Sequence, residues 1–332
     1  MHLAGRLDQH RLSSQVLRDN PLSDPHERDL YVYVPPDYEH TQARLPVVMI
    51  LAGYGGTNYT LLNYDLFAEN VVQRVDRLMR TGQCSPALLV LPDANNRWGG
   101  SQFIDSSASG RYQTYLADEV FPFVDRTYRT RAERDARAIV GRSSGGFGAL
   151  RMGIDRPDVC AVVGSHAGDS AFNLSIQPAL VEAAIAYDRA GGVSSFARAF
   201  LAEPGRHSFM AMMILAYSAA YSPAPQAPFP HVTLPFDTAT GELIPAVWQR
   251  FEAHDPLRLM QQQAEALRAV RLWFLDAGDR DEHGLQFGAR RMAAQLRSSG
   301  ATVQHEEFPG THRGTGYRYE YSLPLLITAC YS

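Results

Sequence analysis

The chain has 332 residues, of which 45% are hydrophobic and 20% are charged, so it is long and apolar enough to bury a large core. Its net charge of −4 gives no electrostatic sign of nucleic-acid binding, and the complete absence of lysine excludes Schiff-base and lysine-dyad chemistry. The three cysteines, Cys84, Cys160 and Cys330, are too far apart for a zinc site or a disulfide framework, so we expect neither a metal nor a cofactor.

The N-terminal residues lack the apolar stretch of a secretion signal, and no run of about 18 apolar residues suggests a membrane span. The odd number of unpaired cysteines is typical of a reducing compartment. We therefore expect a cytoplasmic protein that binds neither membranes nor nucleic acid.

Apolar runs alternate with helical stretches along most of the chain. After a polar arm or edge strand within residues 1–28, strands are expected at 29–36, 45–52, 87–92, just before Ser143, and at 159–164, 270–275 and 302–308. Helices are expected at 63–81, 111–126, directly after Ser143, at 283–298 and from Leu323 onward. This alternation predicts an α/β fold with a mostly parallel central sheet, helices on both faces, and a ligand site at the carboxyl ends of the strands.

Residues 173–255 interrupt the alternation. They contain the apolar run 209–217, followed by a passage with five prolines between 223 and 235 that cannot form regular structure. We interpret this segment as a cap-like insertion over the sheet, within a single domain of residues 1–332.

Residues 141–145, Gly-Arg-Ser-Ser-Gly, fit the G-x-S-x-G nucleophile elbow. A serine at the tip of such a tight strand-to-helix turn needs glycine two residues before and after it, because side chains there would collide with neighbouring backbone. The turn also places Ser143 at a helix N-terminus, where free amide groups favour developing negative charge.

Ser143 needs a base, and His312 follows the last predicted strand at the same sheet edge as the elbow. The other candidates are less well placed, since His305 should lie in a strand, His283 should begin a helix, and His166 should line the pocket.

The acid should come between serine and histidine in the chain. Three aspartates crowd the loop after strand 270–275, and we favour Asp281 over Asp276 and Asp279 because it lies past the Gly278 turn. Asp281 would hold the His312 tautomer and stabilise its charged form.

Two amide groups are expected to form an oxyanion hole, those of Ser144 and of Tyr54 in the glycine loop 53–56. The pocket wall is expected to include Gly53, Asn96, Trp98 and His166, and the insertion could add Phe209, Met210, Met213, Tyr217 and Tyr221.

Together these passages resemble the esterase D branch of the α/β-hydrolases, also called the putative esterase family. The similar stretches are residues 51–56, 91–93 with Trp98, 110–115, 141–146, 278–281 and 308–312. The resemblance implies an α/β-hydrolase fold with Ser143, Asp281 and His312 as the triad and Tyr54 and Ser144 as the oxyanion hole. Two features differ from the family pattern: Ala52 occupies a position usually held by histidine, and the insertion is long.

The leading hypothesis is a serine carboxylesterase that hydrolyses soluble short-chain or aryl esters through an acyl-enzyme on Ser143. Three alternatives stay open: an acyltransferase using the same intermediate, a thioesterase of the S-formylglutathione hydrolase type, and a non-catalytic binding protein. The expected partner is a small-molecule ester, and assembly into homo-oligomers is left open.

Overall fold

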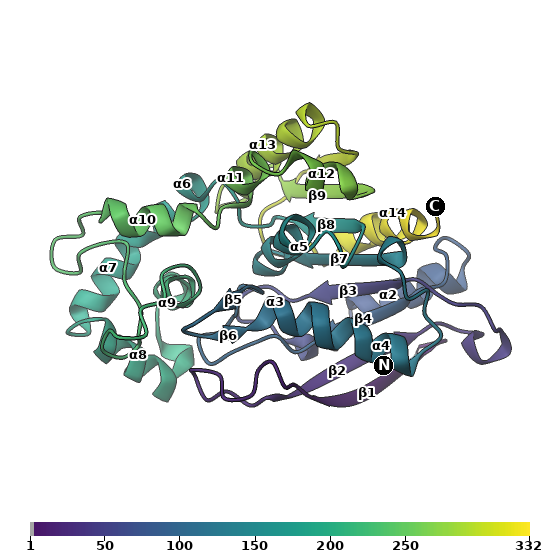
Figure 1. Ribbon diagram of the computed structural model, residues 1–332, viewed down its shortest axis with the longest axis horizontal. Helices are drawn as coiled ribbons and strands as arrows, with labels where there is room; N and C mark the ends of the chain where they lie inside the picture. Colours follow the sequence, from purple (N-terminus) through teal and green to yellow (C-terminus); the bar gives the residue numbers. More distant parts are fainter. Residues whose placement is uncertain (1–2) are drawn as a thin grey trace.

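The central sheet is built from the apolar runs that predicted strands. In the computed structural model, which describes residues 3–332, eight strands pair in the order β1-β2-β4-β3-β7-β8-β9-β10 (Figure 1). Their bounds are β1 (Arg6–Ser13), β2 (Glu27–Val34), β3 (Val47–Leu51), β4 (Leu88–Pro92), β7 (Arg137–Arg142), β8 (Val162–His166), β9 (Leu272–Gly278) and β10 (Val303–Phe308). Strand β2 is antiparallel to β1 and β4, and the other pairs are parallel, which confirms the predicted sheet.

The edge strand expected within residues 1–28 is β1. Residues 1 and 2 lie outside the described residues. Part of the expectations about the N-terminus and about a single domain of residues 1–332 concerns these two residues.

Helices cover both faces of the sheet, as predicted. On one face α2 (Val71–Arg80) and α14 (Tyr319–Tyr331) pack against Val48 and Ile50. The helices on the opposite face, which meet Val47 and Met49, are α4 (Phe121–Thr127), α5 (Ser144–Asp155), α11 (Pro256–Met260), α12 (Ala264–Ala269) and α13 (Leu285–Ser298). Successive strand residues point to opposite faces, so burial on both sides explains why the central strands are continuously apolar.

Some helix boundaries differ from the expectation. The stretch 63–81 is helical only in α2, because the Asn70 side chain caps that helix by accepting from the amide of Gln73; the short α1 (Asn58–Leu61) precedes it. Residues 111–126 form consecutive helical segments, namely α3 (Tyr112–Thr114), a π-helix (Tyr115–Val120) and α4. Helix α14 begins four residues before the predicted Leu323.

Within residues 3–332, no helix combines the length and apolar content needed to cross a bilayer.

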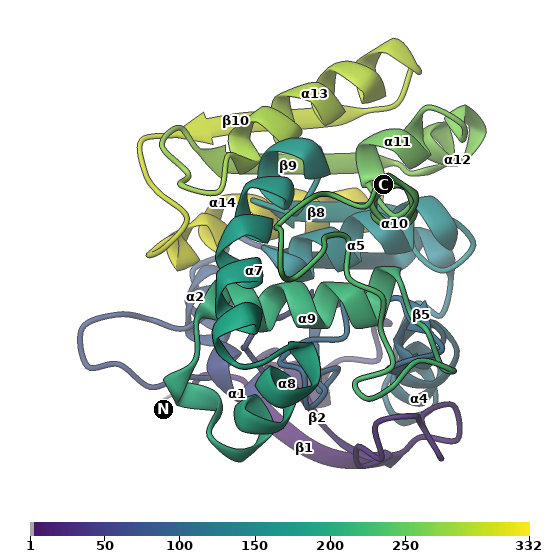
Figure 2. The same ribbon diagram turned by 90° about the vertical axis from the view of Figure 1, so that its left-hand side faces the viewer.

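The insertion forms a helical layer beyond one end of the sheet, on the side that faces the viewer in Figure 2. Its helices are α6 (Phe172–Ser175), α7 (Leu180–Arg189), α8 (Val193–Ala202), α9 (Phe209–Tyr221) and α10 (Pro245–Glu252). Helix α9 is apolar almost all round because the other insertion helices and the body enclose it. The apolar cluster of the insertion also includes Phe147 of α5, whose ring lies 5.8 Å from that of Tyr221. The insertion and the body therefore share one apolar cluster.

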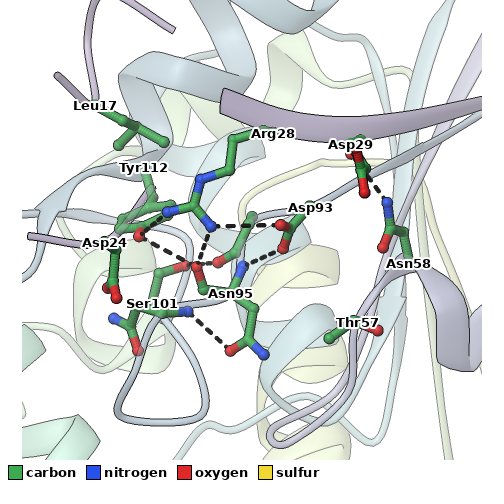
Figure 3. Close-up of polar contacts among 12 residues, drawn as sticks. Leu17, Asp24, Arg28, Asp29, Thr57, Asn58, Asp93, Asn95, Ser101 and Tyr112 are labelled. Atoms are coloured by element: carbon green, nitrogen blue, oxygen red, sulfur yellow. Dashed lines mark hydrogen bonds and ion pairs between the residues drawn. The ribbon is translucent and has the colours of Figure 1, made fainter. Parts of the chain in front are cut away.

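A buried arginine fixes the loop that follows β4 (Figure 3). Arg28 of β2 donates to the carbonyl of Asn95 and to the Tyr112 hydroxyl, each at 2.8 Å, and pairs with Asp93 at 3.4 Å. Nearby, the Asn58 side chain donates to the carbonyl of Asp29 at 2.9 Å. Strand β2 thereby holds both the 93–110 loop and the end of the glycine loop after β3. The 93–110 loop carries the small hairpin of β5 (Asp105–Ser106) and β6 (Gly110–Arg111).

Candidate active site

The predicted strand–turn–helix around Ser143 is confirmed. β7 ends at Arg142, α5 begins at Ser144, and Ser143 between them has φ 57° and ψ −126°, which is a strained conformation for a non-glycine residue. A Cβ on Gly145 would lie 2.3 Å from the carbonyl oxygen of Leu51, and one on Gly141 would lie 2.4 Å from the Gly145 backbone. The two flanking glycines are therefore required by backbone packing against β3.

Ser143, His312 and Asp281 form one hydrogen-bonded row. His312 Nε2 lies 3.1 Å from Ser143 Oγ, and His312 Nδ1 lies 2.8 Å from Asp281 Oδ2. The three residues follow β7, β10 and β9 respectively, so the carboxyl ends of parallel strands bring them together.

Asp281 is buried, and burial alone would raise its pKa. The hydrogen bond from His312 and the charge of that imidazole outweigh burial, together with the amide of His283, which donates to Oδ1 at 2.9 Å. The pKa of Asp281 therefore lies below its ordinary value. An ionised Asp281 holds the proton of His312 on Nδ1, which leaves Nε2 free to accept the proton of Ser143.

The loop that carries His312 is held through its main chain. The His312 amide donates to Glu282 Oε2 at 2.9 Å, and the guanidinium of Arg142 donates to the His312 carbonyl. These two contacts hold the main chain of His312 without using either nitrogen of its imidazole.

Two backbone amides near the nucleophile have no partner among the described residues: Ser144 follows Ser143 directly in the chain, and Tyr54 lines the same cavity as Ser143. Ser144 is the first residue of α5, so its amide has no acceptor within the helix. Within residues 3–332, neither the Ser144 amide nor the Tyr54 amide donates a hydrogen bond to another group. The glycine loop is fixed by the Gly55 amide, which donates to the Gly99 carbonyl at 2.8 Å. A Cβ on Gly53 would lie 3.5 Å from Ser143 Cβ, so this loop packs directly against the nucleophile.

A cavity of about 260 Å³ opens at Ser143. Its lining combines the sheet edge with the insertion: Gly53, Tyr54, Arg142, Ser143, Asp169, Ser175, Phe209, Met213, His283, Leu285, His312 and Arg313. Phe209 and Met213 come from α9, so the expectation that these insertion residues face the site is met. Met210 lines a neighbouring cavity instead, and Tyr217 and Tyr221 are buried.

Asn96 and Trp98, expected in the pocket wall, lie outside this cavity. Trp98 is fully buried, with its ring 6.1 Å from that of Phe200 in the insertion, and its carbonyl accepts a 2.8 Å hydrogen bond from the Tyr54 hydroxyl. Asn96 Oδ1 accepts from the amide of Trp98 at 3.0 Å. Both residues shape the loop that supports Tyr54, so their expected place in the pocket wall is wrong.

His166 is likewise absent from the cavity. Its ring is buried, with Nδ1 2.7 Å from Asp276 and Nε2 2.8 Å from the Ser322 hydroxyl of α14. This buried Ser–His–Asp contact joins β8, β9 and α14. Strand β9 extends to Gly278, so Asp276 belongs to the strand and turns toward His166, away from Ser143.

Sequence reasoning missed five polar residues of the cavity, namely Arg142, Asp169, Ser175, His283 and Arg313. His283 precedes α13 and does not begin it, and its ring stands perpendicular to that of His312 at 4.9 Å. Asp169 follows the end of β8, at the same sheet edge as the elbow. That position along the chain was the signal that could have identified it.

A mostly parallel sheet, an elbow serine after β7 and partners in the order serine, aspartate, histidine define an α/β-hydrolase. A family model described as Putative esterase matches residues 23–322, and the chain belongs to this family.

Relatives and solved structures agree with this assignment. Esterase Rv1288 of Mycobacterium tuberculosis is 29% identical over 166 residues, covering 48% of this chain and 34% of the relative, so the match spans about a third of that curated protein. A ferulic acid esterase structure superposes with a TM-score of 0.63 at 20% identity, covering 99% of this chain and 100% of the other. An S-formylglutathione hydrolase from Agrobacterium tumefaciens gives 0.60 at 15% identity, covering 99% and 97%. Both structures share the fold.

Proposed function

We propose that this protein is a serine carboxylesterase acting on small-molecule esters. The observation that carries the proposal is the hydrogen-bonded row in which His312 lies 3.1 Å from the Ser143 hydroxyl and 2.8 Å from the Asp281 carboxylate. A serine hydroxyl becomes a competent nucleophile when a neighbouring base takes its proton, and a carboxylate holds that base in the right tautomer.

The reaction proceeds in two halves. His312 Nε2 takes the proton of Ser143 as Oγ attacks the ester carbonyl, and the oxyanion accepts hydrogen bonds from the amides of Tyr54 and Ser144. The bond to the alcohol then breaks, and His312 returns the proton to the leaving oxygen. In the second half, His312 takes a proton from water as the water oxygen attacks the acyl carbonyl. The bond between the acyl group and Ser143 Oγ then breaks, and His312 gives its proton to Oγ as the carboxylic acid leaves.

The cavity supports short-chain or small aryl esters. Its volume of about 260 Å³ lies slightly below the range of about 300–1,000 Å³ that is ordinary for ligand pockets. Tyr54, Phe209 and Met213 give it an apolar side, and the edge-to-face contact between Tyr54 and Phe209, with ring centroids 5.3 Å apart, fixes that side. The transferase, thioesterase and non-catalytic alternatives gain no separate support from the geometry.

The test is hydrolysis of p-nitrophenyl esters from acetate to decanoate by the wild type and by Ser143→Ala. We expect hydrolysis by the wild type, best with short acyl chains, and a loss of about three orders of magnitude or more in kcat for the variant. The matched control is Ser165→Ala, which removes a buried hydroxyl from the neighbouring β8 and should retain activity. Equal activity in the wild type and Ser143→Ala would refute the proposal.

A further inference from the structure

Asp169 is a buried carboxylate beside the nucleophile that the mechanism above does not use. It is 6% exposed and lines the same cavity as Ser143 and His312. The Tyr217 hydroxyl of α9 donates to Oδ2 at 2.7 Å. Within residues 3–332, no group donates to Oδ1, so this oxygen has capacity for a donor from outside the chain.

Among residues 3–332, no arginine forms an ion pair with this carboxylate. Of the two arginines in the cavity wall, Arg142 donates to the His312 carbonyl and to Thr315 Oγ1, and Arg313 is exposed. Burial raises the pKa of Asp169, and the hydrogen bond from Tyr217 and the imidazoles of His312 and His283 partly oppose that effect. An unpaired buried carboxylate destabilises a fold, so its presence in a cavity calls for a partner that arrives with a ligand.

Part of the cavity lining is apolar. Tyr54, Phe209 and Met213 contribute no charged group to it. A substrate that fits this lining has an apolar portion and, next to Asp169, a group that donates a hydrogen bond.

We propose that Asp169 is a specificity-determining residue that selects esters carrying a hydroxyl or protonated amine close to the ester group, which donates to Oδ1. This inference rests on the proposed esterase activity. The donor can belong to the acyl half or to the alcohol half of the ester, and matched substrates distinguish the two. A site that desolvates an acceptor discriminates strongly against analogues without the donor, because the acceptor is then left unpaired.

The experiment compares kcat/KM for two isosteric pairs at pH 8, by titration of the released acid. For the alcohol half, the pair is 2-hydroxyethyl butyrate and propyl butyrate. For the acyl half, the pair is methyl 3-hydroxybutyrate and methyl 3-methylbutyrate. In each pair a hydroxyl replaces a methyl group, so the ratio of the two kcat/KM values measures the preference for the donor.

Two variants are compared with the wild type. One is Asp169→Asn, and the other is the double variant Asp169→Leu with Tyr217→Phe. The second substitution removes the Tyr217 hydroxyl, which would otherwise lose its acceptor when Asp169 is replaced. The matched control is Asp76→Asn. Asp76 is a buried carboxylate on α2 that accepts from the Tyr33 hydroxyl at 2.9 Å, outside the cavity.

We expect the preference ratio of one pair to fall about tenfold or more in Asp169→Asn and in the double variant, and to stay unchanged in Asp76→Asn. The pair that responds identifies the half of the ester that carries the donor.

If the double variant does not fold, Asp169→Asn alone decides. Ratios within twofold of the wild type in both pairs overturn the assignment, as does an equal fall in Asp76→Asn. Hydrolysis that is abolished by Ser143→Ala, combined with unchanged ratios, overturns only the role of Asp169. Hydrolysis that survives Ser143→Ala refutes the proposed function and this inference together.

Discussion

At the scale of single residues, close backbone packing creates the nucleophile geometry. Ser143 keeps a positive φ because the strand before it and the helix after it are both fixed, and Gly145 lets α5 approach the carbonyl of Leu51. The strain is stored in the turn and is offset by the packing of β7 and α5 into the core.

Replacing Gly145 by alanine should disrupt the elbow. The new Cβ would lie 2.3 Å from the Leu51 carbonyl oxygen, so either the helix or β3 must move. We expect Gly145→Ala to lose esterase activity and to unfold at a temperature lower by several degrees, measured by circular dichroism. The control is Gly205→Ala, where the methyl group meets open space; a Gly145→Ala enzyme that matches this control would contradict the steric argument.

Asp281 should be required as a carboxylate. An asparagine can keep its place but would favour the wrong tautomer of His312, so we expect kcat to fall about 10²- to 10⁴-fold in Asp281→Asn. Asp279→Asn, in the same loop, is the control. Full activity in Asp281→Asn would show that another group orients His312.

The low pKa of Asp281 also has a consequence for pH dependence. Its ionised form persists down to and below its ordinary range near pH 4, so it does not titrate between pH 5 and 9. We expect Asp281 to contribute nothing to the acid limb of kcat/KM in that range, so that the limb has a slope of one. A slope of two would show that a second group with a raised pKa, such as Asp169, must also be ionised.

At the scale of elements, the insertion is fastened to α5 through His254, between α10 and α11. The ring of His254 stacks on Tyr221 of α9 at 5.0 Å, and Arg151 of α5 lies 3.1 Å from Nδ1. Burial, together with the charges of Arg151 and Arg250, lowers the pKa of His254 to about 4. The neutral ring therefore accepts from Arg151 and joins the two layers.

Acid should weaken this junction. The unfolded chain binds a proton at His254 near pH 6.5 and the folded chain only near pH 4, so stability falls as the pH drops from 6.5 to 4. Between pH 7.5 and pH 5 we expect His254 to account for a loss of about 2 kcal/mol in the free energy of unfolding. Urea unfolding at both pH values measures it, and His254→Gln should lose less stability on acidification than the wild type. Identical losses would contradict the role of His254.

At the scale of the whole molecule, three of the four apolar clusters formed by the described residues are large. Two occupy the faces of the sheet, and the third joins the insertion to Phe147 and Trp98 of the body. Because the third cluster draws on both parts, we propose that 173–255 is a fixed cap within one domain.

Calorimetry of the full chain should then show a single unfolding transition. Phe147→Ala should lower the temperature of that same transition, since removing a fully buried phenylalanine costs about 3–5 kcal/mol. Two separated transitions, with only one shifted by Phe147→Ala, would show that the insertion is an independent unit. The cytoplasmic location and any assembly into homo-oligomers stay predictions from the sequence.

The sequence by itself determined what depends on local patterns. Continuous apolar runs mark strands that are buried on both faces, and the glycine spacing around Ser143 marks a turn that only glycine permits. Chain order then led to His312 and to the aspartate that hydrogen-bonds it, since the Gly278 turn carries Asp281 beyond the strand.

Only the tertiary structure decided what depends on packing between distant segments. Asp276 and Asp281 lie five residues apart, yet one turns to His166 and the other to His312, because the extent of β9 sets their directions. Trp98 lies under the insertion, outside the cavity, because its loop packs against α8. The partnership of Asp169 with Tyr217 spans 48 residues and depends on how the insertion folds back over the sheet. Local periodicity carries no information about such contacts, and so the pocket wall could not be predicted from the sequence.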